Sequence, residues 1–164
     1  MAPQVKESKA VTSGKTSVVA EPGSLEIIVT RLFDCPRERL FNVLTDPALI
    51  PQWWFNTVVD KMEVRPGGIW RYVSNDGQGH DFVSQGVYHE IASPERLIYT
   101  FESAGAPGHV SLQTVTLEDQ NGRTLMTQQS VFQSLADRDG IKAAMAAGAN
   151  AGLNVLAKLV EQRD

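Results

Sequence analysis

The sequence is poor in the groups that most site chemistry uses. Its 164 residues include one cysteine and three histidines, and 15 Lys and Arg stand against 19 Asp and Glu. A single cysteine cannot form a disulfide within the chain, which favours a reducing, cytoplasmic setting. The formal net charge of -4 argues against nucleic-acid binding, because that function needs a basic surface. No stretch approaches 18 consecutive apolar residues, so the sequence predicts no membrane span.

Recognisable catalytic and metal-binding patterns are also missing. His80, His89 and His109 are not spaced as a pair of metal ligands, and one cysteine cannot complete a zinc site. The chain has no nucleophile elbow, no P-loop and no dinucleotide-binding motif. No base is placed beside Cys35, so a buried, inert thiol is favoured over a nucleophile. The sequence therefore predicts no metal, no cofactor and no catalytic residue, and it leaves open whether the protein is an enzyme.

The first 22 residues differ in character from the rest of the chain. They are polar, small and aperiodic, and the one apolar cluster among them is Val18 to Ala20. Such a composition buries too little apolar surface to offset the entropy lost on ordering. We predict a disordered tail over residues 1–22, with a short added strand as the alternative, and a single domain over residues 23–164.

Turn and cap signals divide that domain into elements. Alternating apolar residues from Leu25 to Phe33 predict a strand, and Pro36 and Pro47 each suit the first position of a short helix, Asp46 being the expected cap of the second. Six strand-like runs follow between Val58 and Phe132, separated by turn residues. The order of elements predicts an α+β fold, with helices packed on one face of a curved antiparallel sheet.

A long final helix follows Ser134, which with Asp137 resembles a capping box. Its expected inner stripe repeats every three or four residues and consists of Ile141, Met145, Gly148, Ala149, Gly152, Leu156 and Leu159. Glycine inside a helix costs roughly 0.5–1 kcal/mol relative to alanine, so the two glycines need a reason. Close helix–sheet contact is one reason, and space for a ligand is the other; both stay open.

One ordered series of motifs carries a family resemblance. The series runs through Arg31–Pro36, Thr45–Pro47, Gln52–Trp54, Arg65–Trp70, Gly86–Tyr88, Ser93–Leu97 and the helix Ile141–Leu159. It resembles the START-like (SRPBCC) superfamily, and within it the branch of the activator of ninety-kilodalton heat-shock protein ATPase homologue C-terminal domain. The resemblance implies a helix-grip fold: about seven antiparallel strands curve around a long C-terminal helix, two short helices follow the first strand, and a cavity lies between sheet and helix.

The candidate site follows from that implied cavity together with strand parity. Trp70 and Tyr72 share a strand face, and Gln113 and Gln128 share parity with apolar neighbours, so these polar groups are expected inside, with a solvated strand face as the alternative. Ala149 stands where relatives often have an aromatic residue, which affects the shape of the cavity. The predicted ligand-binding residues are Trp54, Trp70, Tyr72, Phe82, Tyr88, Tyr99, Phe101, Gln113, Gln128, Met145 and Ala149.

Three functions remain open on this reading. The first is binding of a small, mostly apolar molecule in the cavity between the sheet and the C-terminal helix. The second is a cofactor-independent enzyme of the polyketide cyclase or aromatase type, which is an analogy at the level of the fold. The third is a chaperone-associated interaction module. The expected partner is a small hydrophobic ligand, with no nucleic acid and no membrane span, and a homodimer stays open.

Overall fold

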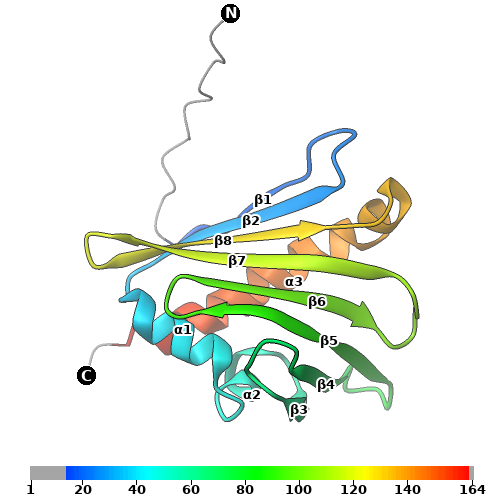
Figure 1. Cartoon of the computed structure of the whole chain (residues 1–164), viewed down its shortest axis with the longest axis horizontal. Coiled ribbons are helices and arrows are strands. Elements are labelled where there is room, and N and C mark those ends of the chain that lie inside the picture. Colours follow the sequence, from blue (N-terminus) through cyan, green and yellow to red (C-terminus); the bar gives the residue numbers. More distant parts are fainter. Residues whose placement is uncertain (1–13, 163–164) are drawn as a thin grey trace, which may run out of the picture.

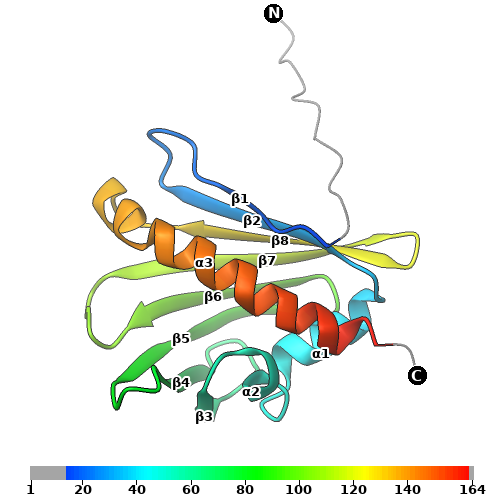
Figure 2. The same cartoon turned by 180° about the vertical axis from the view of Figure 1, so that it is seen from behind.

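The protein is described by a computed structural model that covers residues 14–162. Over that range one antiparallel sheet lies against helices on one of its faces (Figures 1 and 2). The strands are β1 Ser17–Val19, β2 Glu26–Phe33, β3 Thr57–Met62, β4 Ile69–Asn75, β5 Asp81–Ala92, β6 Arg96–Ser103, β7 Val110–Gln120 and β8 Arg123–Val131. The helices are α1 Arg37–Thr45, α2 Ile50–Trp53 and α3 Leu135–Val160.

The sheet has the order β1-β2-β8-β7-β6-β5-β4-β3. Strands β3 to β8 form the predicted six-stranded meander, and β2 joins its far side by pairing with β8. Asn121 and Gly122, with φ of 56° and 88°, make the tight turn between β7 and β8, as their tolerance of positive φ predicts. The α+β class and the helix-grip arrangement expected from the sequence are confirmed.

The eighth strand is the main difference from the expected sheet of about seven strands. Ser17–Val19 lies inside the segment expected to be a tail, yet it pairs with β2 through Val18 and Val29. The alternative of a short added strand is therefore correct for these residues. The remainder of the tail prediction, over residues 1–13, lies outside the described residues.

The helix boundaries follow the capping signals with small shifts. Helix α1 begins at Arg37, one residue after the predicted start. The Asp46 carboxylate accepts a hydrogen bond from the Ala48 N–H at 2.9 Å, so it caps a turn, and α2 begins only at Ile50. The Ser134 hydroxyl accepts from the Asp137 N–H at 3.1 Å, which confirms the predicted N-cap of α3.

Helix α3 crosses the concave face of the sheet diagonally (Figure 2), and its two halves are packed very differently. In the C-terminal half, Leu156 and Val160 are fully buried. In the stretch 140–152 no residue is buried, and a Cβ added at Gly148 or Gly152 would meet no heavy atom within 4 Å. Close helix–sheet contact is therefore not the reason for these two glycines.

By length and composition alone, α3 could also cross a membrane. Of its most apolar 18-residue window, 22% is buried. Core helices of soluble proteins have the same length and composition, and the C-terminal half of α3 is such a helix in this fold. The predicted absence of a membrane span stays a prediction.

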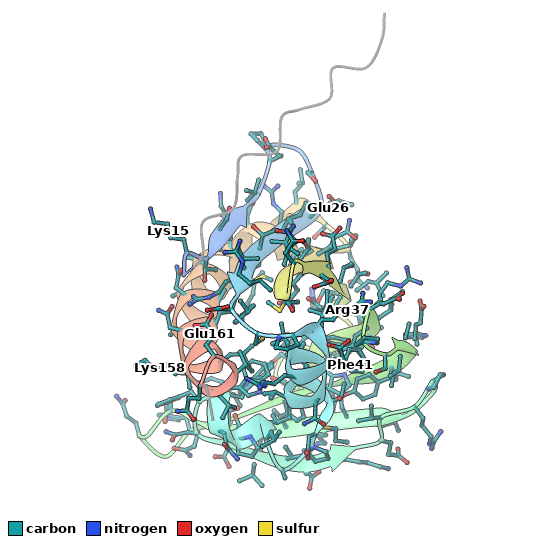
Figure 3. The ribbon with its side chains drawn as sticks, turned by 90° about the vertical axis from the view of Figure 1, so that its left-hand side faces the viewer. Lys15, Glu26, Arg37, Phe41, Lys158 and Glu161 are labelled. Carbon is teal, nitrogen blue, oxygen red and sulfur yellow. The ribbon has the colours of Figure 1, made fainter. Side chains whose placement is uncertain are left out.

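The C-terminal end of α3 is tied to the connection between β2 and α1. The Asp34 N–H donates to the Glu161 carboxylate at 2.9 Å, and the Arg39 guanidinium donates to the Val160 carbonyl at 3.1 Å. Figure 3 looks onto this end, where α1, with Arg37 and Phe41, stands beside the last turns of α3, with Lys158 and Glu161. The long helix is therefore anchored at its C-terminal end.

Two groups of buried side chains fill the space between sheet and helices. The first, called the main core here, lies under α1 and the C-terminal half of α3 and includes Ile27, Phe33 and Leu156. The second lies beside α2, over β4 to β6, and has Trp70, Tyr72 and Tyr88 at its centre. The second group contains the candidate site.

Candidate functional site

Aromatic rings gather on the inner face of β4, β5 and β6. Trp70 and Tyr72 alternate along β4, and their ring centroids lie 4.8 Å apart. Tyr88 and Tyr99 stand opposite one another on β5 and β6, and Trp54 at the end of α2 meets the Tyr72 ring edge-on at 5.3 Å. These five residues, Trp54, Trp70, Tyr72, Tyr88 and Tyr99, are called the aromatic cluster below.

A glycine on β5 makes this arrangement possible. The Trp70 indole N–H donates to the Thr100 carbonyl at 3.1 Å across Gly86, which is the residue opposite Trp70 in the sheet. A Cβ at Gly86 would lie 1.8 Å from the Thr100 oxygen and 2.6 Å from the Trp70 nitrogen. Any larger residue would therefore displace the indole, which explains why Gly86 precedes Tyr88 in the motif.

The aromatic cluster lines a small, partly open cavity of about 30 Å³. That volume holds about one water molecule, whereas pockets for drug-sized ligands measure roughly 300–1,000 Å³. The cavity is lined by the sheet and α2 and not by α3. In this state the candidate site is therefore too small for such a ligand, and a ligand larger than water requires one of the rings to move.

The cluster contains all three tyrosines of the chain. The Tyr72 hydroxyl donates a hydrogen bond to the Met62 sulfur at 3.7 Å. Burial raises the pKa of each hydroxyl, and it raises the pKa of Tyr88 to about 12. At physiological pH the three groups are therefore neutral and can act as hydrogen-bond donors.

A polar row crosses the inner face of the sheet and ends at the cluster. Ser130, Gln113, Tyr99 and Tyr88 lie directly opposite one another on β8, β7, β6 and β5. The Gln113 side-chain carbonyl accepts from the Ser130 hydroxyl at 2.6 Å and from the Gln128 amide at 2.9 Å. The Gln113 amide donates to the Ser111 hydroxyl at 2.9 Å. The glutamines are thus inside, as predicted, and their partners are protein groups.

The remaining predicted residues lie around the cluster or apart from it. Phe101 packs against Trp70, with ring centroids 5.7 Å apart. Met145 and Ala149 pack against the main core, so α3 does not bring them to the cavity. Phe82, near the start of β5, shares the inner face by register but is 58% exposed. A ligand-binding role for these residues stays a prediction.

Sequence reasoning missed two buried arginines that hold the β1–β2 hairpin against α3. Arg31 is 4% exposed, and its guanidinium donates to the Asn154 side chain at 2.6 Å and to the Thr16 hydroxyl at 3.1 Å. Arg138 donates to the carbonyls of Glu21 and Ser24, each at 2.6 Å. Arg31 shares strand parity with apolar neighbours, which was the available signal. Both arginines help to set the position of α3 over the sheet.

A second, larger hollow lies away from the aromatic residues. This groove, of about 380 Å³, lies at the start of β6 and the end of β7, beside the start of α1. It is lined by Arg37, Glu95, Arg96, Thr116, Leu117, Glu118 and Asp119. It carries charges of both signs, and Arg96 already pairs with Glu90 at 2.6 Å. The lining residues come from α1, β6, β7 and the turn before β6. They form no motif, so nothing in the sequence indicated this groove.

The thiol of Cys35 offers no reactive group. The side chain is 2% exposed, and burial raises its pKa to about 11, so it is a neutral thiol at physiological pH. Among residues 14–162, no group of three or more His, Cys, Asp or Glu side chains could hold a metal ion. The aromatic cluster is therefore the candidate site that the geometry favours.

Comparison with known proteins agrees with this architecture. Protein Ms6760 from Mycobacterium smegmatis has a similar structure, with a TM-score of 0.82 at 18% identity over 92% of this chain and 99% of that one. A protein from Rhodobacter sphaeroides has a TM-score of 0.79 at 24% identity, over 90% and 98%. Protein CV1439 from Chromobacterium violaceum has a TM-score of 0.73 at 24% identity, over 84% and 99%. At these identities the likeness concerns the fold alone.

The sequence itself places the chain in a family. The family model described as "Activator of Hsp90 ATPase homolog 1-like protein" matches residues 34–161, which is most of the chain. No curated protein matches the chain. The protein belongs to this family of Hsp90 ATPase activator homolog 1-like proteins, within the START-like superfamily.

Proposed function

We propose that the protein binds a small, mostly apolar molecule at the aromatic cluster, on the concave face of the sheet beside α2. The observation that carries this proposal is the cavity itself. Two indole rings and three neutral tyrosines surround a hollow, although close packing is the rule in protein interiors. Apolar walls with a few orienting polar groups are the usual composition of small-molecule sites.

Binding requires the cluster to open, and Trp54 is the ring best placed to move. Four of the five lining side chains come from strands of the sheet, whereas Trp54 follows the last residue of the four-residue helix α2. The next residue, Phe55, is 74% exposed, and Asn56 has a positive φ of 42°. A short helix followed by an exposed turn offers less resistance to displacement than a hydrogen-bonded strand.

The chemistry of the cavity favours a binding protein over an enzyme of the cyclase type. Acid–base catalysis needs a positioned group whose pKa lies near the working pH. The five lining residues include no carboxylate and no histidine, and the hydroxyl pKa values are raised well above neutrality. The cavity therefore has groups that orient a ligand but no pair of groups that would exchange protons with it.

A titration with the uncharged dye N-phenyl-1-naphthylamine tests the proposal. We expect saturable dye fluorescence with the parent protein and at least a fivefold weaker affinity with Trp54→Gln, because that change puts an amide on the apolar wall. Phe55→Gln is the matched control, since Phe55 is the exposed neighbour and does not line the cavity. Unsaturable binding, or equal losses in both variants, would contradict a site at the cluster.

An interaction module remains a second candidate on a separate observation. Phe55 and Val58 are 74% and 67% exposed, close together at the start of β3. Exposed apolar side chains of this size that lie near one another are typical of protein-binding surfaces. Phe55→Gln combined with Val58→Thr would remove such a surface without touching the cavity, so loss of a protein partner with intact dye binding would separate the two functions.

A further inference from the structure

The outward side of α3 is apolar over four turns of the helix. A helix on the surface of a domain normally has charged residues on its outward side. Between Lys142 and Lys158, however, α3 contains no charged residue, and its only polar side chains there are two asparagines. Ile141 and Val155 are 40% and 44% exposed although both are large and apolar. Figure 2 shows α3 in front of the sheet, with no other helix or strand over it.

Five exposed residues of this side form one stripe along the helix. Their spacing of three, four, three and four residues is that of a coiled-coil seam. The stripe, called the outer seam here, consists of Ile141, Ala144, Gly148, Ala151 and Val155. Ile141 and Gly148, which the sequence predicted on the inner stripe, thus belong to the outward side. No residue of the outer seam lines the aromatic cavity.

The outer seam is complementary to itself in an antiparallel pair of helices with a two-fold axis at Gly148. In such a pair, residues equally far before and after Gly148 lie opposite one another, and both copies use the same surface. Ile141 and Val155 are each seven residues from Gly148, so at both ends a large side chain packs against a large one. Between them, Ala144, Gly148 and Ala151 have no atoms beyond Cβ, so the two backbones can approach closely.

The charges near the ends of α3 favour the same antiparallel arrangement. Asp137 is in the first turn and Lys158 in the last. They lie eleven and ten residues from Gly148, so each Asp137 comes close to Lys158 of the other copy. The Asp137 side chain, which bonds His109 at 2.9 Å, is still 24% exposed. A parallel pair would instead bring like charges together, and the helix dipoles also favour the antiparallel pair.

We infer that the protein forms an antiparallel homodimer through the outer seam of α3. The inference does not depend on the proposed function, because the seam and the cavity share no residue. One pair of helices buries less surface than a standard interface of roughly 1,600 Å², so the dimer is weak. We expect a dissociation constant on the order of 10–100 μM, which leaves the chain monomeric at low micromolar concentrations.

Sedimentation equilibrium over a range of protein concentrations tests the dimer. The average mass of the parent protein should rise from 18.0 kDa toward twice that value. Ala144→Glu should weaken the dimer at least tenfold, because it buries a carboxylate in an apolar seam. Ala143→Glu is the matched control: it makes the same change at the adjacent exposed residue, which lies outside the outer seam, and the dissociation constant should stay within twofold.

Engineered cysteines test the register of the pair. Gly148→Cys should give a disulfide-linked dimer under mild oxidation, because that position lies opposite itself. The native Cys35 is 2% exposed, so its background reaction is small. Asn150→Cys is the control, since Asn150 is exposed on nearly the opposite side of the helix. Ile141→Cys and Val155→Cys should cross-link when the two proteins are mixed, and neither should cross-link alone.

Three results would overturn the inference. A mass of 18.0 kDa at every concentration would exclude the dimer. A dimer that persists in Ala144→Glu, or that cross-links as readily through Asn150→Cys as through Gly148→Cys, would use another surface. Sedimentation with vesicles of phosphatidylcholine and phosphatidylglycerol gives the third: binding of monomeric protein that is lost in Ala144→Glu but kept in Ala143→Glu would assign the outer seam to a membrane surface.

Discussion

The main core and the aromatic cluster both lie between the sheet and the helices, but they are built differently. In the main core, Ile27 and Leu156 are fully buried and have no polar atoms to satisfy. In the aromatic cluster, three tyrosines bring hydroxyl groups among the rings, and a small hollow remains. Because close packing is the rule in protein interiors and polar groups are costly to bury, folding alone favours the first composition over the second. The proposed ligand-binding role would account for the difference.

The two halves of α3 repeat this contrast. Leu156 and Val160 anchor the C-terminal half in the main core, whereas the stretch 140–152 has no buried residue. The C-terminal half holds α3 against the sheet, and the loosely packed half contributes no residue to the lining of the cavity. Stability and binding should therefore respond to different substitutions.

Trp70→Ala should have the largest effect, because Trp70 is central to the cluster and also packed. Its side chain is 2% exposed, contacts the rings of Tyr72, Tyr99 and Phe101, and donates to the Thr100 carbonyl. We expect a loss of about 3–5 kcal/mol in the free energy of unfolding, the usual cost for a packed tryptophan. Urea denaturation measures it, and a loss below about 1 kcal/mol would show that the cluster contributes little to the fold.

Leu156→Ala is the control from the main core. It should cost about 2–5 kcal/mol, because Leu156 is fully buried there. At temperatures where the variant is folded, its affinity for N-phenyl-1-naphthylamine should equal that of the parent protein. If Leu156→Ala weakened dye binding as much as Trp54→Gln, the two regions would not be functionally distinct.

Removal of residues 1–22 should destabilise the protein, contrary to the expectation from composition that this segment is dispensable. The deletion takes away β1 and also the Thr16 and Glu21 acceptors of the buried Arg31 and Arg138. A buried guanidinium that loses partners costs more than a lost surface contact. Thermal unfolding should show a midpoint several degrees lower, and removal of residues 1–13 alone is the control. An unchanged midpoint for the longer deletion would mean that the hairpin contributes no stability.

Stability should also fall at alkaline pH because of the cluster. Burial raises the folded-state pKa of the three tyrosines above the ordinary value of 10, to about 12 for Tyr88. Between those two pH values the unfolded chain loses protons that the folded protein keeps, so the free energy of unfolding decreases as pH rises above about 10. Tyr88→Phe should make the decrease between pH 10 and 12 shallower in chemical denaturation. The same slope in both proteins would mean that Tyr88 is not buried as described.

Gly148→Ala should have the smallest effect and the opposite sign. A Cβ there meets no heavy atom within 4 Å, and the residue lies in the loosely packed half of α3. Alanine should therefore stabilise the helix by about 0.5–1 kcal/mol. The change in urea midpoint measures this, and destabilisation would reveal a close contact at this position.

Local signals in the sequence account for most of the architecture. The N-cap at Ser134, the Asn121–Gly122 turn and the alternating residues of β2 each act within a few residues, so they predict the element order correctly. For the segment that forms β1, the sequence favoured a disordered tail over a strand. The position of β1 depends on contacts of Arg31 and Arg138 with residues far away in the chain. The amino-acid composition of a segment does not predict hydrogen bonds with residues so distant in the sequence.

The candidate site was harder to predict because parity identifies a face but not its position along the sheet. Phe82 and Tyr88 share the inner face, yet Phe82 lies near the start of β5 and is 58% exposed. Met145 and Ala149 lie on the expected helix face, but the cavity is closed by Trp54 from α2 instead. Which element lines the cavity depends on side-chain positions, and the spacing of residues in the sequence does not give those positions.

Mapping of N-phenyl-1-naphthylamine binding by amide and indole NMR signals tests the central claim most directly. The account predicts saturable shifts of the Trp54 and Trp70 indole N–H signals and of backbone amides around Tyr88 and Tyr99. It predicts no shifts at the charged groove near Arg37 and Thr116, which is the larger hollow of the two. Saturable shifts confined to that groove, with the two indole signals unchanged, would contradict binding at the aromatic cluster.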